Sequence, residues 1–441
     1  MAERPCGFNS LLPHQLLPDS CDADLPESTC SSTPGARSAD SWIHRGVVNA
    51  RVVCCHDRFA RSLRPPHRSR GQPMKQSSAK LRAARAQRMP LRGKQKMILR
   101  SRRYLNLEMP VRLLDTWLTP VELFYVRNHL TQPRVNLPEW RLRVSGEVNP
   151  FELTFADLEK LPQATVTNTL ECAGNGRTFY RPRVRGTEWT RGAVGTATFT
   201  GPRLADVLHR AGVKAGGKHV AFDGLDESSA KVPDFIRSIP IEKAMHPDTL
   251  LATMMNGAPL TPEHGFPVRA LVPGWIGAAS VKWLAEVRVL DRELDGHFMK
   301  AYRLPKRPVA PGEPVSPEEM AAMTALDVKS IIARPGDGSR WKLGPLHITG
   351  AAWAGEADIV RVDVSTDFGR TWQPADLRRE QAKYAWRLWD FTWTPPATGC
   401  YVLLSRATDS SGRRQPLLPS WNPGGYFWNV IDQVRIHVVK A

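Results

Sequence analysis

Apolar and polar residues alternate over several short stretches of the chain, which is the pattern of half-buried β-strands. Most of these stretches end at Pro or Gly, so the strands are expected to be short. The pattern predicts strands at 123–130, 140–148, 164–172 and 357–365, and two more within 265–290 around a Pro-Gly turn.

Two segments show helical spacing instead. The segment 154–162 begins with Thr154, and Asp157 follows three residues later, as expected for an N-cap. The second segment is 200–213. Its apolar face consists of Leu204, Val207, Leu208 and Ala211, with Thr200 expected to begin the helix and Gly212 to end it.

The C-terminal part of the chain has an all-β pattern. It follows a segment, 303–325, that contains five prolines and is predicted to be a linker. Trp389, Phe391 and Trp393 alternate along one further strand and are expected to line one face. Short strands separated by turns over this length favour a β-sandwich of immunoglobulin type. The Cys…Trp…Cys signature is absent from it, so the sandwich is expected to lack that disulfide.

The net charge of +18 is concentrated near the N-terminus and does not describe the whole chain. Residues 1–50 carry −3, residues 51–103 carry +16, and residues 104–441 carry only +5. The basic segment has little apolar periodicity, so it is expected to be a disordered extension. A basic arm that binds nucleic acid or anionic lipid is the alternative, but no aromatic residues are interleaved with its charges. Met89 or Met97 as the natural start is a further alternative.

The predicted domains follow from these changes in composition. Residues 1–96 form the extension, 97–310 a first domain, 311–325 the linker and 326–441 the sandwich. Cys6, Cys21, Cys30, Cys54 and Cys55 all lie in the extension without metal-ligand spacing and are assigned no role. No run of 18 apolar residues occurs, so no membrane span is expected.

The stretch TLECAGNGR, residues 169–177, places a single cysteine at the end of a predicted strand. Cys172 and Cys400 are the only cysteines after residue 104, so a dense disulfide framework is excluded. Cys172 is therefore either a small buried side chain or a thiolate presented to a ligand. Gly174 and Gly176 behind it would allow a bulky group to approach the backbone closely.

Several long motifs occur in order, from FYVRNH and LECAGNGR through GTEWTRGAVGTATFTG and FDGLD to MMNGAPLTPEHGFPVRALVPGWIGAASVKW, VDVSTDFGRTW and WNPGGYFWN. Together they resemble the sulfite oxidase family of molybdenum enzymes, from about residue 98 to the end. The resemblance implies an α+β, β-rich fold: a molybdopterin domain of sulfite oxidase type followed by an immunoglobulin-like domain that mediates dimerisation.

The resemblance also assigns roles to individual residues. Cys172 would be the molybdenum ligand, since a thiolate is a soft ligand that suits this metal. Tyr302 would be the catalytic tyrosine, and Arg127, Arg177 and Trp189 would line the substrate pocket; ordinary surface residues are the alternative at these positions. The cofactor contacts would be Tyr125, Val126, Arg127, Asn128, His129, Asp226, His264, Arg269, Ser280, Val281 and Lys282.

Arg269 and Lys282 lie on neighbouring predicted strands and are expected to hold the cofactor phosphate, because charged donors bind an ionised acceptor strongly. A solvated strand face is the alternative for either residue alone.

The sequence departs from the family in two places. Vertebrate and plant sulfite oxidases have an arginine shortly after a Trp-Asn pair in the C-terminal domain, whereas this chain continues as Pro423, Gly424 and Gly425. The family also has an arginine where this chain has Gly176. A less positive pocket calls sulfite itself into question as the substrate.

The predicted function is oxidation of sulfite or a related reduced sulfur compound by a homodimeric enzyme with a molybdenum–molybdopterin cofactor. No haem-attachment or iron–sulfur motif is present, so no haem and no iron–sulfur cluster are expected. Electrons would pass to a separate acceptor, with a c-type cytochrome as one candidate; no nucleic-acid partner is expected.

Three alternatives remain: reduction of an S- or N-oxide at the same metal, a cofactor-free binding protein, and thiol redox chemistry at Cys172. The last lacks a resolving cysteine. The cytoplasm is preferred over the periplasm as the compartment, since residues 101–107 resemble a twin-arginine motif but no apolar segment follows.

Overall fold

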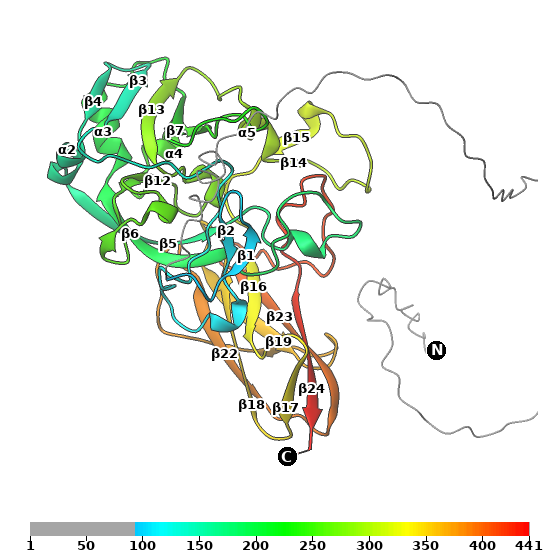
Figure 1. Cartoon of the computed structure of the whole chain (residues 1–441). Helices are drawn as coiled ribbons and strands as arrows, with labels where there is room; N and C mark the ends of the chain where they lie inside the picture. Colours follow the sequence, from blue (N-terminus) through cyan, green and yellow to red (C-terminus); the bar gives the residue numbers. More distant parts are fainter. Residues whose placement is uncertain (1–92, 441) are drawn as a thin grey trace, which may run out of the picture. The chain divides into compact units, whose positions relative to one another are not determined.

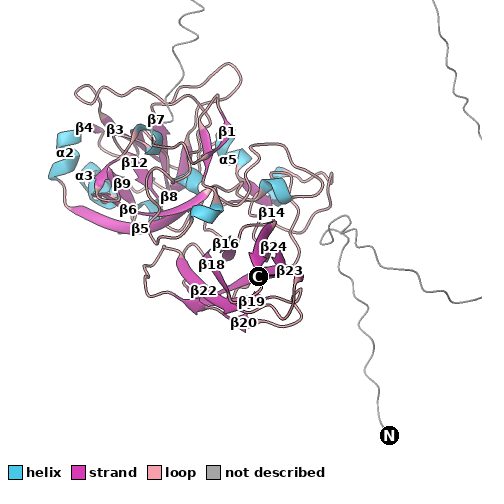
Figure 2. Cartoon of the chain, turned by 60° about the horizontal axis from the view of Figure 1, so that its bottom comes forward, coloured by secondary structure: helices cyan, strands magenta, loops and turns pink. Residues whose placement is uncertain are grey.

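The computed structural model describes residues 93–440 (Figure 1). The five N-terminal cysteines, Met89 and nearly all of the predicted basic extension lie outside the described residues. Strands and loops make up most of the described chain, and the helices are short (Figure 2). Two β-rich parts follow each other: an N-terminal part, residues 93–305, and a C-terminal sandwich, residues 329–439. This order confirms the predicted fold class.

A five-stranded sheet forms one layer of the N-terminal part. β13 lies parallel to β3, and the other neighbours are antiparallel. Across the sheet the order is β4 (Phe151–Leu153), β3 (Leu142–Gly146), β13 (Leu284–Leu290), β7 (His219–Gly224) and β8 (Arg237–Pro240).

The second sheet of the N-terminal part contains the predicted strand that leads to Cys172. β5 (Gln163–Glu171) pairs with β6 (Val194–Pro202) along its whole length, so its end is firmly fixed. β10 (Met254–Met255) and β11 (Ala258–Pro259) complete this sheet. Three two-stranded pairs accompany it: β1 (Ile98–Ser101) with β2 (Asn106–Glu108), β9 (Leu250–Ala252) with β12 (Arg269–Leu271), and β14 (Arg303–Pro305) with β15 (Met320–Ala322).

Both predicted helices are present, with one corrected boundary. α2 (Phe155–Lys160) has the capping box: the Asp157 amide donates to Thr154 Oγ1, and the Thr154 amide donates to Asp157 Oδ2, both at 3.1 Å. α3 (Leu204–Ala211) buries the predicted apolar face and ends at Gly212 in the left-handed region. Thr200 does not begin α3, because it belongs to β6.

The remaining helices are single turns. The α-helical ones are α4 (Ile241–Ala244) and α5 (His297–Ala301). The 3₁₀ turns are η2 (Val111–Leu113), η3 (Arg177–Phe179), η4 (Pro262–His264), η5 (Gly277–Ala279) and η6 (Pro317–Glu319).

The prediction of a strand at 123–130 is wrong. The Phe124 amide donates to the Pro120 carbonyl at 3.0 Å, so the segment begins in a turn. Only Val126 forms a bridge, with Leu107, in both backbone directions at 2.9 Å. The side chains at 124–126 are all buried, which produced the apolar run without a regular strand.

Two other predictions need adjustment. The segment 265–290 does contain two strands, β12 and β13, but they lie in different sheets and η5 separates them. The proline-rich segment predicted as a linker contains β14 and β15, which pair with each other. Met323 and Leu326 at its end are buried, so this connection is ordered and packed.

The C-terminal sandwich consists of two sheets around one apolar core. Trp389, Phe391 and Trp393 all contribute to this core, as predicted. One sheet contains, in order, β16 (Lys329–Arg334), β18 (Leu346–Trp353), β22 (Arg387–Trp393) and β21 (Asp376–Leu377). The other contains β17 (Ser339–Lys342), β24 (Asp432–Val439), β23 (Gly399–Asp409), β19 (Ile359–Ser365) and β20 (Gln373–Pro374).

The sheet that contains β16, β18 and β22 buries both of its faces. Ile332 and Ala352 point into the sandwich core, whereas their neighbours Ile331 and Trp353 join a cluster with residues of the N-terminal part. That cluster also contains Tyr302. Because side chains alternate across a strand, one sheet can hold both cores together. No helix in the described residues is long and apolar enough to cross a membrane.

Replacing Gly350 with alanine is expected to destabilise the sandwich. A Cβ at Gly350 would overlap the Trp389 ring and the Ile331 carbonyl, which lie on the strands on either side. Overpacking of this kind costs about 1–3 kcal/mol. Urea unfolding followed by tryptophan fluorescence measures the loss. Gly336→Ala is the control, since its Cβ would meet nothing within 4 Å; equal stability of the two variants would contradict the packing described.

Candidate active site

One cavity of the N-terminal part encloses about 700 Å³ of space not filled by atoms, its open mouth included. Its walls come from several segments that are far apart in sequence. Of the predicted site residues, those that line it are Tyr125, Arg127, Asn128, His129, Cys172, Asp226, His264, Arg269, Ser280, Val281, Lys282 and Tyr302.

Cys172 lies at the inner end of β5, on the cavity wall. Its amide donates to the Ala193 carbonyl at 2.9 Å, which extends the pairing with β6 by one residue. The Asn175 amide donates to the Cys172 carbonyl at 2.8 Å and closes a turn. The side chain is only 8% exposed, so Cys172 is both buried and directed to a cavity.

Tyr302 follows α5 and reaches the same cavity. Its hydroxyl lies 2.9 Å from His129 Nε2. Burial raises the pKa of Tyr302 above its ordinary range, so the phenol holds its proton at neutral pH. Burial, together with Arg127 and Lys282, lowers the pKa of His129 well below its usual value. The tautomer of the neutral imidazole decides the direction of this hydrogen bond: with the proton on Nε2, His129 donates to the Tyr302 oxygen and leaves the phenol proton available.

Arg127, Arg269 and Lys282 bring positive charge to the cavity. Burial, with the nearby guanidinium of Arg269, lowers the pKa of Lys282 well below its ordinary value, and burial lowers that of Arg269 to about 10. Asp226 is one of two carboxylates on the wall, and burial raises its pKa to about 6. The wall therefore carries three basic side chains against two carboxylates.

Arg269 and Lys282 lie close together near Gly265, but the predicted pair of neighbouring strands is not present: Arg269 begins β12, whereas Lys282 precedes β13 and belongs to no strand. A Cβ at Gly265 would be 3.1 Å from the Cβ atoms of both. Arg269 donates to the carbonyls of His264 and Ser280 at 3.2 and 3.0 Å. Lys282 donates to Asn128 Oδ1 and, at 2.9 Å, to the Glu263 carbonyl.

Buried donors remain available in this cavity. Within the described chain, Asn128 Nδ2 and Arg269 Nε have no hydrogen-bond partner. Burying such groups without a partner is costly, so they indicate a ligand that accepts hydrogen bonds. Basic side chains, free donors and a thiol on the wall of one cavity fit the phosphate, the pterin edge and the metal of a molybdopterin cofactor.

Three of the predicted site residues do not line this cavity. Trp189 is fully buried in a core cluster that also contains Cys172, and Val126 belongs to a different core cluster. Arg177 lines a neighbouring hollow with Arg183 and Gly186. It donates to the Gly424 carbonyl at 3.1 Å.

The C-terminal loop 421–429 approaches the site with aromatic side chains. Tyr426 stacks on Tyr302 with ring centroids 5.3 Å apart, and the Arg177 guanidinium lies 4.9 Å from the Tyr426 ring centroid. A Cβ at Gly424 would overlap the Tyr426 ring, and one at Gly176 would lie 2.5 Å from Trp428 Cβ. The two positions where the family has arginines are therefore closed by Tyr426 and Trp428.

Lys94 was missed by the sequence analysis, which assigned it to the extension. It is only 5% exposed, and its Nζ lies 3.2 Å from His264 Nε2 and donates to the Val121 carbonyl at 2.6 Å. Phe235, which stacks on His129 at 4.4 Å, was also missed. Neither shows a sequence signal, because a single lysine in a basic segment and a single aromatic residue in a loop are common.

Comparisons with known proteins identify the family of the chain. Residues 129–298 match the family model of the oxidoreductase molybdopterin binding domain, and residues 320–439 match that of the Mo-co oxidoreductase dimerisation domain. Mitochondrial sulfite oxidase of Rattus norvegicus is 37% identical over 358 residues, and sulfite oxidase of Gallus gallus is 40% identical over 343 residues. The rat match covers 77% of this chain, and the chicken match covers 74% of each protein.

A solved structure is also similar: the sulfane dehydrogenase SoxCD from Paracoccus pantotrophus, with 30% identity and a TM-score of 0.68. That match covers 77% of this chain and 87% of the other. The chain belongs to the sulfite oxidase family of molybdopterin oxidoreductases. It spans 65% of the length of the mammalian relatives it matches.

Raising the pH is expected to stabilise the protein relative to a Lys94→Met variant. Burial lowers the pKa of Lys94 to about 8. The unfolded chain therefore binds the proton more tightly, and the cost of burying this group decreases as the pH rises from 8 towards the ordinary lysine pKa of 10.5. Between pH 8 and 10 the difference in unfolding free energy should change by about 2 kcal/mol in favour of the wild type. Urea unfolding measures it, with the exposed Lys96→Met as control; a difference independent of pH would contradict the buried position.

Inorganic phosphate is expected to raise the thermal midpoint of the cofactor-free protein, because an anion would offset the repulsion among the cavity cations. A ligand at 100 times its dissociation constant stabilises by about 2.7 kcal/mol. Lys282→Met should lose much of this effect, whereas the exposed Lys300→Met should keep it. Differential scanning fluorimetry at constant ionic strength tests this; the same shift in both variants would show that the cavity is not the binding site.

Proposed function

We propose that the protein is a molybdenum-dependent oxidoreductase that oxidises sulfite or a related reduced sulfur compound and passes the electrons to an external acceptor. One observation carries the proposal: a single cavity brings together Cys172, the protonated hydroxyl of Tyr302 and three basic side chains. Membership of the sulfite oxidase family supports it, as does the similarity to a sulfane dehydrogenase.

The cofactor would lie along the wall that carries the free donors. Arg269 and Lys282 would bind its phosphate, Asn128 and His264 would contact the pterin, and Cys172 would ligate the metal. When bound, this cofactor supplies two-electron oxo-transfer chemistry. The cations would be held in place before binding, since Arg269 and Lys282 are already fixed by backbone carbonyls.

The protein's own contribution to catalysis would be binding and proton placement. Arg127 is half-buried on the cavity wall and would attract an anionic substrate. Tyr302 would hold a proton at its hydroxyl for donation to a substrate oxygen, while His129 fixes the direction of that hydroxyl. Phe235 and Phe298 pack around His129 and would limit access of water to this pair.

The loop 421–429 favours a substrate with less negative charge than sulfite. Tyr426 occupies the space where a further cation would be needed, and Gly424 has no room for a side chain. Loss of a buried charge pair with an oxyanion costs about 2–5 kcal/mol of binding. A sulfane sulfur substrate, the class named for the SoxCD neighbour, is therefore the second candidate.

The partners are proposed from the C-terminal sandwich and from the chemistry. Its match to a dimerisation domain supports a homodimer, which light scattering after gel filtration would test. The electrons require a separate acceptor, and a c-type cytochrome remains one candidate.

Cys172→Ser is expected to retain the pterin but lose turnover, since many residues share the pterin contacts and a single thiolate contacts the metal.

Tyr302→Phe should lower kcat by about 10²–10⁴, the usual contribution of a positioned proton donor. Molybdenum analysis is combined with turnover of sulfite, thiosulfate and an organic sulfoxide, using artificial electron acceptors and donors. Cys400→Ser is the control for loss of an exposed thiol.

Wild-type protein that contains no molybdenum when produced in a host that makes the cofactor would refute the proposal. Full activity of molybdenum-loaded Cys172→Ser would remove the role of Cys172. Turnover of the sulfoxide alone would assign the reductive reaction instead.

A further inference from the structure

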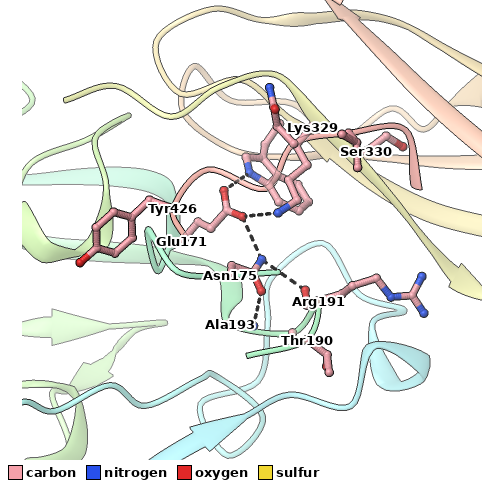
Figure 3. A network of polar contacts seen from close by, with 12 residues as sticks. Glu171, Asn175, Thr190, Arg191, Ala193, Lys329, Ser330 and Tyr426 are labelled. Atoms are coloured by element: carbon pink, nitrogen blue, oxygen red, sulfur yellow. Dashed lines mark hydrogen bonds and ion pairs between the residues drawn. The ribbon is translucent and has the colours of Figure 1, made fainter. Parts of the chain in front are cut away.

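The carboxylate of Glu171 is buried directly beside Cys172 and contacts both parts of the molecule (Figure 3). Glu171 is the last residue of β5 and only 6% exposed. Its Oε1 accepts hydrogen bonds from Asn175 Nδ2 and Lys329 Nζ, each at 2.8 Å. Its Oε2 accepts one from Trp353 Nε1 at 2.7 Å. Both oxygens are thus held by specific donors.

In the N-terminal part, Glu171 contacts Asn175, which belongs to the turn that contains Cys172. Asn175 is buried, and its Oδ1 accepts a hydrogen bond from the Ala193 amide at 3.1 Å. The Asn175 amide closes the turn on the Cys172 carbonyl. A substitution of Glu171 would therefore affect the backbone of Cys172 through one intervening residue, Asn175.

On the side of the sandwich, the two donors form a cross-strand pair. Lys329 begins β16, Trp353 ends β18, and the two are opposite each other in the sheet register. Lys329 is only 4% exposed, and its ammonium lies 5.7 Å from the Trp353 ring centroid. The fold of the sandwich therefore fixes both donors to the same carboxylate.

Stability alone does not account for this arrangement. A buried ion pair loses about as much in desolvation as it gains in attraction, and apolar side chains of similar size often replace such pairs without loss. What the pair does provide is a fixed geometry and a balanced charge. Without Lys329, Glu171 would place an uncompensated negative charge one residue from the Cys172 thiolate.

We propose that Glu171 and Lys329 are positioning residues: their ion pair holds the Cys172 turn against the sandwich and cancels the charge beside the thiolate. The sandwich is then part of the metal site as well as a candidate dimerisation domain. The inference rests on the proposed function, in which Cys172 ligates molybdenum.

The test is the midpoint potential of the bound metal in the loaded protein, measured by potentiometric titration. Lys329→Met leaves a negative charge beside the thiolate, which favours the oxidised metal and lowers the potential. Glu171→Gln leaves a positive charge, which favours the reduced metal and raises the potential. The double variant carries neither charge and should return close to the wild-type value. A purely structural role would not produce shifts of opposite sign.

Two variants serve as controls. Lys329→Arg keeps the charge and should keep the wild-type potential. Asp432→Asn breaks another ion pair between the two parts, Arg191 Nη1 to Asp432 Oδ2 at 2.8 Å, which does not contact Glu171. It should also leave the potential unchanged.

Shifts of the same sign in the two single variants, or no shift in Glu171→Gln, would overturn the inference. If Lys329→Met does not fold, the upward shift in Glu171→Gln and its reversal in the double variant decide the question. Metal analysis of the wild type separates this inference from the proposed function. Wild-type protein without molybdenum refutes both, whereas a loaded wild type with equal potentials in all variants refutes the ion-pair role alone.

Discussion

The gathering of three basic side chains around one cavity, against only two carboxylates, is the constraint on which the site depends. Burial lowers the pKa values of Arg269 and Lys282, and the wall adds Arg127. Such a cavity opposes folding, because like charges repel more strongly away from water. It persists because backbone carbonyls fix these side chains and because the apolar cores stabilise the fold elsewhere. The most direct physical reason for keeping it is an anionic ligand.

Strand pairing positions the part of the cavity wall that contains Cys172. β5 and β6 pair over nine residues, so the position of Cys172 is determined by a ladder that begins far from the cavity. The sandwich then contacts the same place through Lys329, Trp353 and the Phe427 amide, which donates to the Ala173 carbonyl at 2.9 Å. The geometry at Cys172 is therefore a property of both parts of the molecule.

Periodicity predicted the elements whose side chains have one buried face. α2 and α3 were found within a few residues, since one face of each is buried. β5 and β19 were found as well, although consecutive residues at their C-terminal ends are all buried. The segment 123–130 misled the prediction because its side chains are buried on several sides around a turn. The proline-rich connection misled it as well, since prolines at strand ends are compatible with a short pair such as β14 and β15.

The residues that line the cavity came largely from the family motifs, because spacing alone does not bring Tyr125, Cys172 and Lys282 together. Lys94, the Glu171–Lys329 pair and the position of Tyr426 follow only from the three-dimensional arrangement. Each depends on which side chain meets which across separate segments, and no local pattern in the sequence encodes that.

The geometry separates the proposed cofactor contacts from the residues that would select the substrate. The donors for the cofactor lie within the N-terminal part, and backbone hydrogen bonds hold them. The loop 421–429 belongs to the C-terminal part and places Tyr426 against Tyr302. A hydrogen bond within the loop fixes Tyr426: its amide donates to Asn422 Oδ1 at 2.9 Å. A substitution in this loop would change the charge and shape near Tyr302 and leave Arg269 and Lys282 untouched. Differences in substrate charge between members of such a fold can therefore arise in the C-terminal loop without loss of the cofactor site, and Pro423, Gly424 and Gly425 are where this loop departs from the family pattern.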